Sequence, residues 1–252
     1  MQLVDTHCHP HFDEISGPEV LKRASKAGVN KVIAVGVSLE DSRRAIDYAA
    51  SHQNVWATAG IHPHEAKDFG VAAGMELKKL LNMSSIVGAG EIGLDYYRLN
   101  SPKEEQLSAL RAQIEITQPT GLPFTFHVRD AWKDFWQVFD EYRGLKGVVH
   151  SFTGGPKQLE QALSRGLYVA LNGIVTFTRD QAMLLAAQKV PLDRLVLETD
   201  APFLLPVGAK EKTCEPMHVR NVAEFLAKLR GESLEEIAAA TSKNAEEIFN
   251  LK

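Results

Sequence analysis

The sequence predicts an α/β protein of the single-domain (β/α)₈ class, the TIM barrel. Eight short apolar runs that resemble buried parallel strands alternate with amphipathic helical patterns. The length of 252 residues matches the roughly 250 residues typical of such barrels. No composition shift, low-complexity tract or long linker divides the chain, so we expect one domain over residues 1–252. A doubly wound open sheet is the alternative, because it shows the same alternation.

The expected strands are residues 3–6, 31–37, 55–60, 86–90, 123–127, 147–150, 167–171 and 195–199. The expected helices are residues 18–27, 39–51, 101–116, 130–142, 156–165 and 180–188, with two or more helices within 217–251. Pro18 near the start of the first helix and Gly28 after its end follow the usual helix punctuation. Ser101, Pro102 and Glu104 match a capping box, which predicts that a helix begins after Ser101.

Composition and charge narrow the classes of function. The net charge of −4 gives no broad basic surface for nucleic acid, although bound cations and local Arg and Lys residues can still hold phosphates. The two cysteines, Cys8 and Cys214, are too few for a disulfide framework, which predicts a reducing, cytoplasmic compartment. We expect neither a secretory leader nor a membrane span, because residues 2–5 are strand-like and no apolar run approaches about 20 residues.

Six potential metal ligands end the predicted strands. His7 and His9 are two residues apart, so their side chains point to the same face, whereas Cys8 points away and is expected to be a packed, unreactive thiol. The other four ligands end strands four, five, six and eight: Glu91, His127, His150 and Asp200. Each position alone is more often structural. Because the active face of a barrel lies at the C-terminal ends of its strands, the six together predict one site.

The combination of imidazole and carboxylate ligands predicts divalent metal chemistry. It suits Zn²⁺, Mn²⁺, Fe²⁺, Ni²⁺ or Co²⁺, whereas Mg²⁺ prefers mostly oxygen ligands. Six ligands are too many for one tetrahedral ion and suit two ions about 3.5–4 Å apart. We expect Glu91 to bridge the ions and Asp200 to accept a proton from the attacking water. The sequence therefore predicts metal-assisted hydrolysis, with Asp200 and Glu91 as catalytic residues.

Other motifs carry less weight. Residues 88–93 match G-x-G-x-x-G after a strand, but no apolar helix start follows, as a dinucleotide fingerprint requires. The chain has no P-loop motif and no G-x-S-x-G motif, which argues against an NTPase and a serine hydrolase. His11, His52 and His218 lie outside the strand-end pattern, and we interpret them as surface or packing residues.

Short segments around the strand ends form an ordered set. They are Asp-Thr-His-Cys-His at 5–9, Gly-Ile-His-Pro-His at 60–64, Gly-Glu-Ile-Gly-Leu-Asp-Tyr-Tyr at 90–97, Phe-His-Val-Arg-Asp-Ala at 126–131, His-Ser-Phe-Thr-Gly at 150–154 and Glu-Thr-Asp-Ala-Pro-Phe-Leu at 198–204. Together they resemble the TatD family of metal-dependent deoxyribonucleases. The segments run in order from end to end, so the resemblance covers the whole chain, and the ordered set is more specific than any single motif.

The resemblance implies a barrel with a one- or two-metal centre that hydrolyses DNA phosphodiesters, often as a 3′→5′ exonuclease. It implies metal-ligand roles for the six residues named above, and phosphate or substrate contacts for His62, Arg98 and Arg129. Tyr96 and Tyr97 either stack on an unpaired base or pack in the core. We therefore expect two divalent ions, Mg²⁺ or Mn²⁺ in function, with Zn²⁺, Ni²⁺ and Fe²⁺ as further candidates for the bound ions.

The chain departs from the family pattern after the last strand. The family often has a Gly-Lys-Arg-Asn-Glu-Pro-like segment, whereas residues 209–216 are Ala-Lys-Glu-Lys-Thr-Cys-Glu-Pro, with Cys214 where Asn is usual. We expect residues 202–216 to form a loop over the mouth of the barrel, so the change concerns substrate preference and not metal chemistry. Gln-Pro-Thr-Gly at 118–121 predicts a shortened helix before strand five.

Three hypotheses for the function follow. The first is a metal-dependent nuclease acting on single-stranded DNA ends, without a membrane or an obligate protein partner. The alternative is a hydrolase of the same barrel acting on a small ester, amide or acyl-nucleotide substrate, since one barrel serves many substrates. The third is a non-enzymatic nucleic-acid-binding protein. The complete ligand set argues against the third, because a binding protein needs neither an activated water nor a base.

Overall fold

The strands of the computed structural model, which describes residues 1–15 and 17–252, alternate with helices along the chain. The strands are β1 (Leu3–Cys8), β2 (Val29–Val35), β3 (Val55–Ala59), β4 (Ile86–Asp95), β5 (Phe124–Arg129), β6 (Gly147–His150), β7 (Tyr168–Leu171) and β8 (Leu195–Leu197). Their order in the sheet is their order in the chain, and each pair with a described register is parallel. This is the alternation of eight strands and helices that the sequence predicts.

The α-helices of the described residues are α1 (Pro18–Lys26), α2 (Leu39–Ser51), α3 (Val71–Leu80), α4 (Lys103–Thr117), α5 (Trp132–Phe139), α6 (Pro156–Ser164), α7 (Ile174–Phe177), α8 (Gln181–Lys189), α9 (Val219–Arg230) and α10 (Leu234–Phe249). Short 3₁₀ turns occur at η1 (Pro63–Asp68), η2 (Gln118–Thr120), η3 (Leu192–Arg194) and η4 (Pro216–His218). In the part of the chain that the structure describes, no helix combines the length and apolar character needed to cross a bilayer.

Several boundaries differ from the sequence prediction. β4 does not end at residue 90 but continues to Asp95, because its glycines extend the strand instead of ending it. Ser101 is not a helix cap: its hydroxyl donates to the carbonyl of His64 and accepts from the amide of Lys67, and α4 begins after Pro102. Helix α3 was not predicted, since its apolar residues show little helical periodicity. The expected shortening before strand five is confirmed, because α4 ends at Thr117 and a 3₁₀ turn follows.

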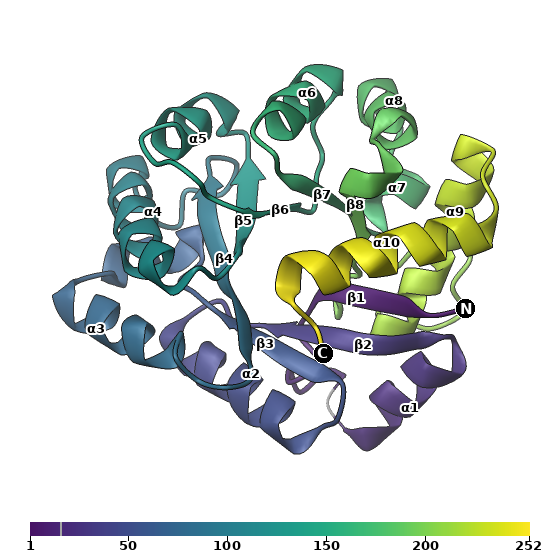
Figure 1. Cartoon of the computed structure of the whole chain (residues 1–252), viewed down its shortest axis with the longest axis horizontal. Helices are drawn as coiled ribbons and strands as arrows, with labels where there is room; N and C mark the ends of the chain where they lie inside the picture. Colours follow the sequence, from purple (N-terminus) through teal and green to yellow (C-terminus); the bar gives the residue numbers. More distant parts are fainter. Residues whose placement is uncertain (16) are drawn as a thin grey trace. The chain divides into compact units, whose positions relative to one another are not determined.

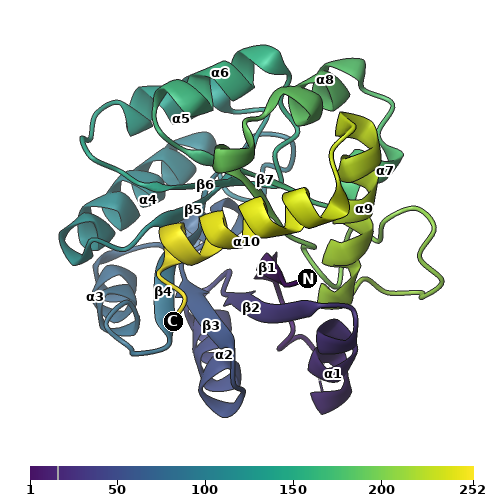
Figure 2. The same cartoon turned by 45° about the vertical axis from the view of Figure 1, so that its right-hand side comes forward.

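The chain forms two compact units, and the first comprises Met1–Ala34 and Ser151–Lys252. Within it β1 pairs with β2, and β7 pairs with β8. The hydroxyl of Thr6 donates to the carbonyl of Leu197 at 3.0 Å, which joins β1 to β8. Helix α10 lies beside β1 in both views (Figures 1 and 2) and begins with a capping box between Ser233 and Glu236. The ends of β1 and β8 are thus held next to each other.

The second unit, Val35–His150, contains β3 to β6 in parallel register. In this register His127 of β5 lies opposite Gly93 of β4 and His150 of β6. The rings of Phe124 and Phe126 stack at 5.2 Å and are fully buried. Since buried aromatic side chains contribute much of the apolar area of a core, they anchor β5 and with it the position of His127.

The loop that departs from the family pattern is attached to the first unit. Cys214 is buried, and its amide donates to the carbonyl of Pro202 at 3.2 Å. The imidazole of His218 lies 3.0 Å from the carboxylate of Glu211, and His218 is itself a buried packing residue, as interpreted from the sequence. The unusual thiol therefore packs inward. The expected position of this loop over a barrel mouth stays a prediction.

Candidate metal centre

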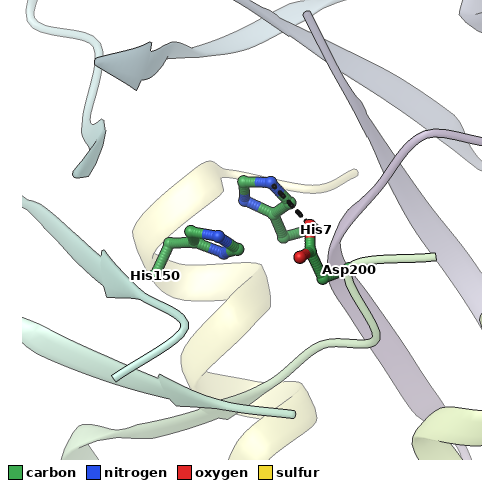
Figure 3. A group of neighbouring side chains, drawn as sticks. All are labelled: His7, His150 and Asp200. Atoms are coloured by element: carbon green, nitrogen blue, oxygen red, sulfur yellow. Dashed lines mark ion pairs between the residues drawn. The ribbon is translucent and has the colours of Figure 1, made fainter. Parts of the chain in front are cut away.

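A first cluster of potential ligands, here called the N-terminal cluster, consists of His7, His9 and Asp200. Oδ1 of Asp200 lies 3.7 Å from Nε2 of His7 and 3.5 Å from Nε2 of His9. Figure 3 shows the His7 ring, the Asp200 carboxylate and the dashed line that joins them; the third side chain drawn, His150, belongs to the second unit. Ligands 2.0–2.2 Å from one tetrahedral ion lie about 3.4 Å from each other. The distances thus fit ligands of a common ion.

Main-chain hydrogen bonds bring the N-terminal cluster together. The amide of Asp200 donates to the carbonyl of His7 at 2.8 Å, and the amide of His9 donates to the carbonyl of Ala201 at 2.7 Å. Asp200 has φ 61°, in the left-handed region that aspartate tolerates better than most residues. The backbone itself therefore places the Asp200 carboxylate beside the two imidazoles.

Asp5 on β1 is hydrogen-bonded to Thr199, which follows β8, and to His7 of the cluster. The sequence did not single out this residue. Its carboxylate accepts hydrogen bonds from the amide of Thr199 (3.0 Å), the hydroxyl of Thr199 (2.6 Å) and the amide of His7 (3.2 Å). Burial raises the pKa of Asp5 to about 8, although these hydrogen bonds oppose the shift. The signal for Asp5 was its position two residues before His7, on the same face of β1.

The surroundings of the cluster differ on its two sides. Cys8 is buried with its thiol 3.6 Å from the carbonyl of Ile33, and burial raises its pKa, which confirms the prediction of a packed, unreactive thiol. His9 stacks on Phe12 with ring centroids 4.7 Å apart, and Phe203 approaches it at 6.3 Å. Phe203 is half exposed, so the His9 side of the cluster is bordered by an aromatic ring that reaches the surface.

A second cluster, here called the Glu91 cluster, lies in the second unit and consists of Glu91, His62, His127 and His150. Oε1 of Glu91 lies 2.6 Å from Nδ1 of His127, 3.5 Å from Nε2 of His62 and 3.5 Å from Nε2 of His150. Glu91 and His150 are buried, and His62 and His127 are partly exposed. The structure thus surrounds one carboxylate with three imidazoles, and it places His62, a predicted substrate contact, beside the predicted ligands.

Within the Glu91 cluster, Glu91 and His127 each favour the charged form of the other. Burial alone would raise the pKa of Glu91, but the charges of His150, His62 and His127 hold it well below its usual value. Burial alone would lower the pKa of His127, but Glu91 and Asp95 raise it above its usual value. For His62 burial dominates and lowers the pKa to about 3. Before any ion binds, Glu91 is therefore anionic and His62 neutral at pH 7.

Glycine at position 93 makes the approach of Glu91 to His127 possible. Gly93 has φ 151°, and a Cβ atom there would collide with the carbonyl of His127. β4 therefore passes close to β5 where Glu91 meets His127. Since the strand continues through Gly93 to Asp95, the G-x-G-x-x-G match does not open a helix, which confirms that it is not a dinucleotide fingerprint.

His62 faces the cluster as a donor. Its Nδ1 accepts a hydrogen bond from the amide of His64 at 3.1 Å and caps η1. A neutral imidazole that accepts at Nδ1 carries its hydrogen on Nε2. This hydrogen is directed to the side where Glu91 lies, so His62 is suited to an anionic substrate group, as the sequence predicts, and less suited to a metal ion.

Asp95 and His64 extend the hydrogen-bonded chain beyond His127, and the sequence did not single out either residue. Oδ2 of Asp95 lies 3.2 Å from Nε2 of His127 and 3.1 Å from Nε2 of His64. Burial would raise the pKa of Asp95, but the His127 hydrogen bond and the Arg98 amide hold it below its usual value. With β4 extended to residue 95, the alternation of Glu91, Gly93 and Asp95 would have placed both carboxylates on one face.

The two predicted arginine contacts lie outside the Glu91 cluster. The guanidinium of Arg129 lies over the ring of Tyr97 at 3.9 Å, a cation–π arrangement, and both side chains are exposed. The Arg98 side chain is exposed, while its backbone amide donates to Oδ1 of Asp95 at 2.8 Å. Tyr97 therefore stacks on a cation and not in the core. Tyr96 donates to Asp134 at 2.9 Å.

Both clusters offer the donor set of a divalent metal site. The N-terminal cluster combines two imidazoles with a carboxylate, and in the second unit His127 and His150 lie 2.6 and 3.5 Å from the Glu91 carboxylate. Nitrogen and carboxylate donors together favour Zn²⁺, Mn²⁺ and related ions. The residues present therefore fit the divalent metal that the sequence predicts.

Comparisons with known proteins agree with this chemistry. The family model described as TatD related DNase matches residues 4–250. The chain is 35% identical over 241 residues to the 3′-5′ ssDNA/RNA exonuclease TatD of Erwinia amylovora, which covers 92% of this chain and 93% of that protein. It is 32% identical over 253 residues to the metal-dependent hydrolase YabD of Bacillus subtilis, which covers 99% of both chains.

Solved structures match over the same length. The TatD homolog YJJV from Escherichia coli K12 gives a TM-score of 0.92 at 30% identity and covers 99% of this chain and 98% of its own. A hydrolase of the TatD family from Entamoeba histolytica gives 0.91 at 27% identity, with 100% and 99% coverage. These matches confirm the predicted (β/α)₈ fold class. The chain belongs to the TatD family of metal-dependent DNases, as the strand-end motifs predict.

Proposed function

We propose that this protein is a metal-dependent deoxyribonuclease that removes nucleotides from single-stranded DNA ends in the 3′→5′ direction. The observation that carries the proposal is the arrangement of imidazoles around the carboxylates of Asp200 and Glu91. Support comes from the relative in Erwinia amylovora, whose name states the same polarity and a single-stranded substrate. The alternative of a small ester, amide or acyl-nucleotide substrate has no such support.

We assign the ligand roles to His7, His9, Glu91, His127, His150 and Asp200, which would hold two divalent ions. Mg²⁺ or Mn²⁺ is the proposed working ion, and Zn²⁺, Ni²⁺ or Fe²⁺ are further candidates. Two such ions, when bound, neutralise the phosphodiester and make a water molecule acidic enough to attack it. The family membership and the donor sets support this assignment.

Asp200 is the proposed base. Its side chain is 18% exposed, whereas those of His7 and His9 are 0% and 3% exposed, so it is the member of the N-terminal cluster that water reaches most easily. Its carboxylate accepts the proton of the attacking water. Glu91 remains anionic throughout, because its pKa lies far below 7.

Three residues are the proposed contacts of the DNA backbone. The neutral His62 donates from Nε2 to a phosphate oxygen without gaining a charge of its own. Arg129 offers a guanidinium held flat on Tyr97, and such a planar group suits bidentate binding of phosphate. Arg98 lies on the exposed segment after β4. With a net charge of −4, binding relies on these local groups and on the metal ions.

We further propose that residues 1–252 act as one domain in the cytoplasm. The family model runs through both units without interruption, which supports a single functional domain. The two buried cysteines are unpaired thiols, which suits a reducing compartment. No protein partner is needed in this scheme.

A labelled single-stranded oligonucleotide incubated with Mg²⁺ or Mn²⁺ tests the proposal. We expect stepwise shortening from the 3′ end, and we expect Asp200→Asn to abolish it without changing the fold by circular dichroism. The matched control is Asp193→Asn, an aspartate of the same unit outside both clusters, which should retain activity. Full activity of Asp200→Asn, or hydrolysis of small esters without any cleavage of the oligonucleotide, would disprove the proposal.

A further inference from the structure

We infer that Asp95 is a positioning residue that fixes the ring of His127 so that Nδ1 is the atom offered to the metal. The inference rests on the proposed function in one respect, the role of His127 as a metal ligand. It adds a second carboxylate to the site, whose role is to orient a ligand and not to touch the ion or the substrate.

The two ring nitrogens of His127 face two different carboxylates. Nδ1 lies 2.6 Å from Oε1 of Glu91, and Nε2 lies 3.2 Å from Oδ2 of Asp95. Glu91 is a proposed ligand that also lies near His62 and His150, so the Nδ1 side is the side of the metal. Asp95 lies on the opposite side of the ring, where its carboxylate can only accept a hydrogen.

A ligating imidazole has one hydrogen and one free electron pair. In the neutral, ligating form of the ring, Asp95 keeps the hydrogen on Nε2, so the electron pair is on Nδ1, the nitrogen on the Glu91 side. Such carboxylate–histidine–metal arrangements orient the ring and increase the basicity of the ligand, and loss of the outer carboxylate typically costs about 10–100-fold in metal affinity. The structure thus assigns to Asp95 the selection of the ligating nitrogen.

Asp95 is itself held firmly enough for this role. It is 1% exposed, and Oδ1 accepts from the amide of Arg98 at 2.8 Å. The side chain of the fully buried Gln106 accepts from the amide of Asp95 at 2.8 Å and donates to its carbonyl at 3.0 Å. Nε2 of His64 lies 3.1 Å from Oδ2, the oxygen that also faces His127. Oδ1 of Asp95 is therefore held by the Arg98 amide, and Oδ2 faces the two imidazoles.

This arrangement makes the substitution Asp95→Asn a sharp test. The new amide has one oxygen and one NH₂ group. If the oxygen keeps the hydrogen bond from the Arg98 amide, the NH₂ group donates to Nε2 of His127, and the ring hydrogen moves to Nδ1, where a metal is to bind. If the amide is reversed, its NH₂ group opposes the N–H of Arg98. In neither orientation does an asparagine keep both the hydrogen bond from the Arg98 amide and the hydrogen on Nε2 of His127.

The experiment measures Zn²⁺ affinity by competition with a chelator, without nucleic acid. We expect Asp95→Asn to bind Zn²⁺ about 10–100-fold more weakly than the wild type. Asp134→Asn is the matched control: Asp134 accepts from the hydroxyl of Tyr96, the residue after Asp95, but is not among the contacts of the proposed ligands. Its Zn²⁺ affinity should stay within about twofold of the wild type. Equal affinities of all three proteins, or an equal loss in both variants, would overturn the inference.

A measurement on the wild type decides the question even if Asp95→Asn does not fold. ¹⁵N spectra of histidine-labelled, Zn²⁺-loaded protein, with the His127 signals identified through His127→Gln, should show the hydrogen on Nε2 and the metal on Nδ1. The reverse pattern would overturn the inference. Zn²⁺ binding with this pattern but without cleavage of any oligonucleotide would disprove the proposed nuclease activity alone. A wild type that shortens the oligonucleotide with Mg²⁺ or Mn²⁺ but binds no Zn²⁺ would overturn the inference alone.

Discussion

The two ligand clusters are held in different ways. In the N-terminal cluster the histidine–aspartate distances are 3.7 and 3.5 Å, longer than an ordinary hydrogen bond, and main-chain hydrogen bonds between the ends of β1 and β8 set the positions. In the Glu91 cluster the side chains themselves are linked, from Glu91 through His127 to Asp95. A site supported by the backbone tolerates changes in neighbouring side chains, whereas a site supported by a chain of side chains is sensitive to each member.

Glu91→Gln should have the largest effect on activity, because it alters the cluster that is held together by its side chains. It removes the negative charge that faces His127 and His150, and with it a proposed metal ligand. We expect kcat/KM for a single-stranded oligonucleotide to fall about 100-fold or more. Glu105→Gln, on the exposed face of α4, is the control and should change little. A Glu91→Gln enzyme that keeps nearly wild-type activity would contradict the central place given to this carboxylate.

Asp5→Asn should change how the stability of the protein depends on pH, because Asp5 lies beside the N-terminal cluster and has a raised pKa. Asp5 has a folded-state pKa of about 8 against an ordinary value of 3.8, so between these values the folded protein holds a proton that the unfolded chain releases. Its contribution to stability is therefore complete at low pH and is lost as the pH rises towards 8, by at most about 1.4 kcal/mol per pH unit. The urea midpoint of the metal-free protein should fall as the pH rises from about 6.5 to 8. The fall should be less steep in Asp5→Asn than in the wild type.

His62 in the Glu91 cluster gives the opposite pH dependence of stability. Its pKa is lowered to about 3 from 6.5, so the unfolded chain binds the proton more readily and stability is lost as the pH falls through that window. The range above pH 6.5 is chosen for Asp5→Asn because His62 is then neutral in both states. A slope in that range that is the same in Asp5→Asn and wild type would show that Asp5 does not hold a proton.

Arg129→Gln should weaken the binding of DNA without affecting the ions. Loss of one phosphate contact is expected to raise KM several-fold, leave kcat nearly unchanged and reduce the slope of log affinity against log salt by about 0.7. Arg111→Gln is a matched control, because Arg111 pairs with Glu141 and lies on α4, outside both ligand clusters. An unchanged salt slope in Arg129→Gln would remove this arginine from the proposed contacts.

Arg23→Gln should have the smallest effect. Arg23 binds Glu215 through two hydrogen bonds of 2.7 and 2.8 Å, yet its side chain is 43% exposed, so the pair is screened by water. We expect a loss of less than about 1 kcal/mol in unfolding free energy and no change in activity. A large loss of activity would mean that the loop attached through Glu215 takes part in the reaction.

The sequence predicted the alternation of strands and helices that the structure shows, because hydrophobic periodicity is a local signal. The six proposed ligands also stand out locally, for example through the two-residue spacing of His7 and His9. It did not predict the link to Asp95, because glycines at 90 and 93 suggest a strand end unless their contact with β5 is known. Ser101 was wrongly predicted to cap α4, since only the fold reveals that its hydroxyl joins the segment after β4 to η1. Long-range partners of this kind have no local pattern.

Codon 93 should tolerate no missense mutation, because Gly93 has no room for a Cβ atom. Every single-nucleotide missense change of a glycine codon introduces a residue with a Cβ atom, and at position 93 that atom collides with the backbone of His127 whatever the new residue is. The position therefore has no conservative replacement, not even alanine. In a pool of variants selected for activity, codon 93 should be depleted of all substitutions alike, a uniform intolerance that side-chain chemistry alone would not produce.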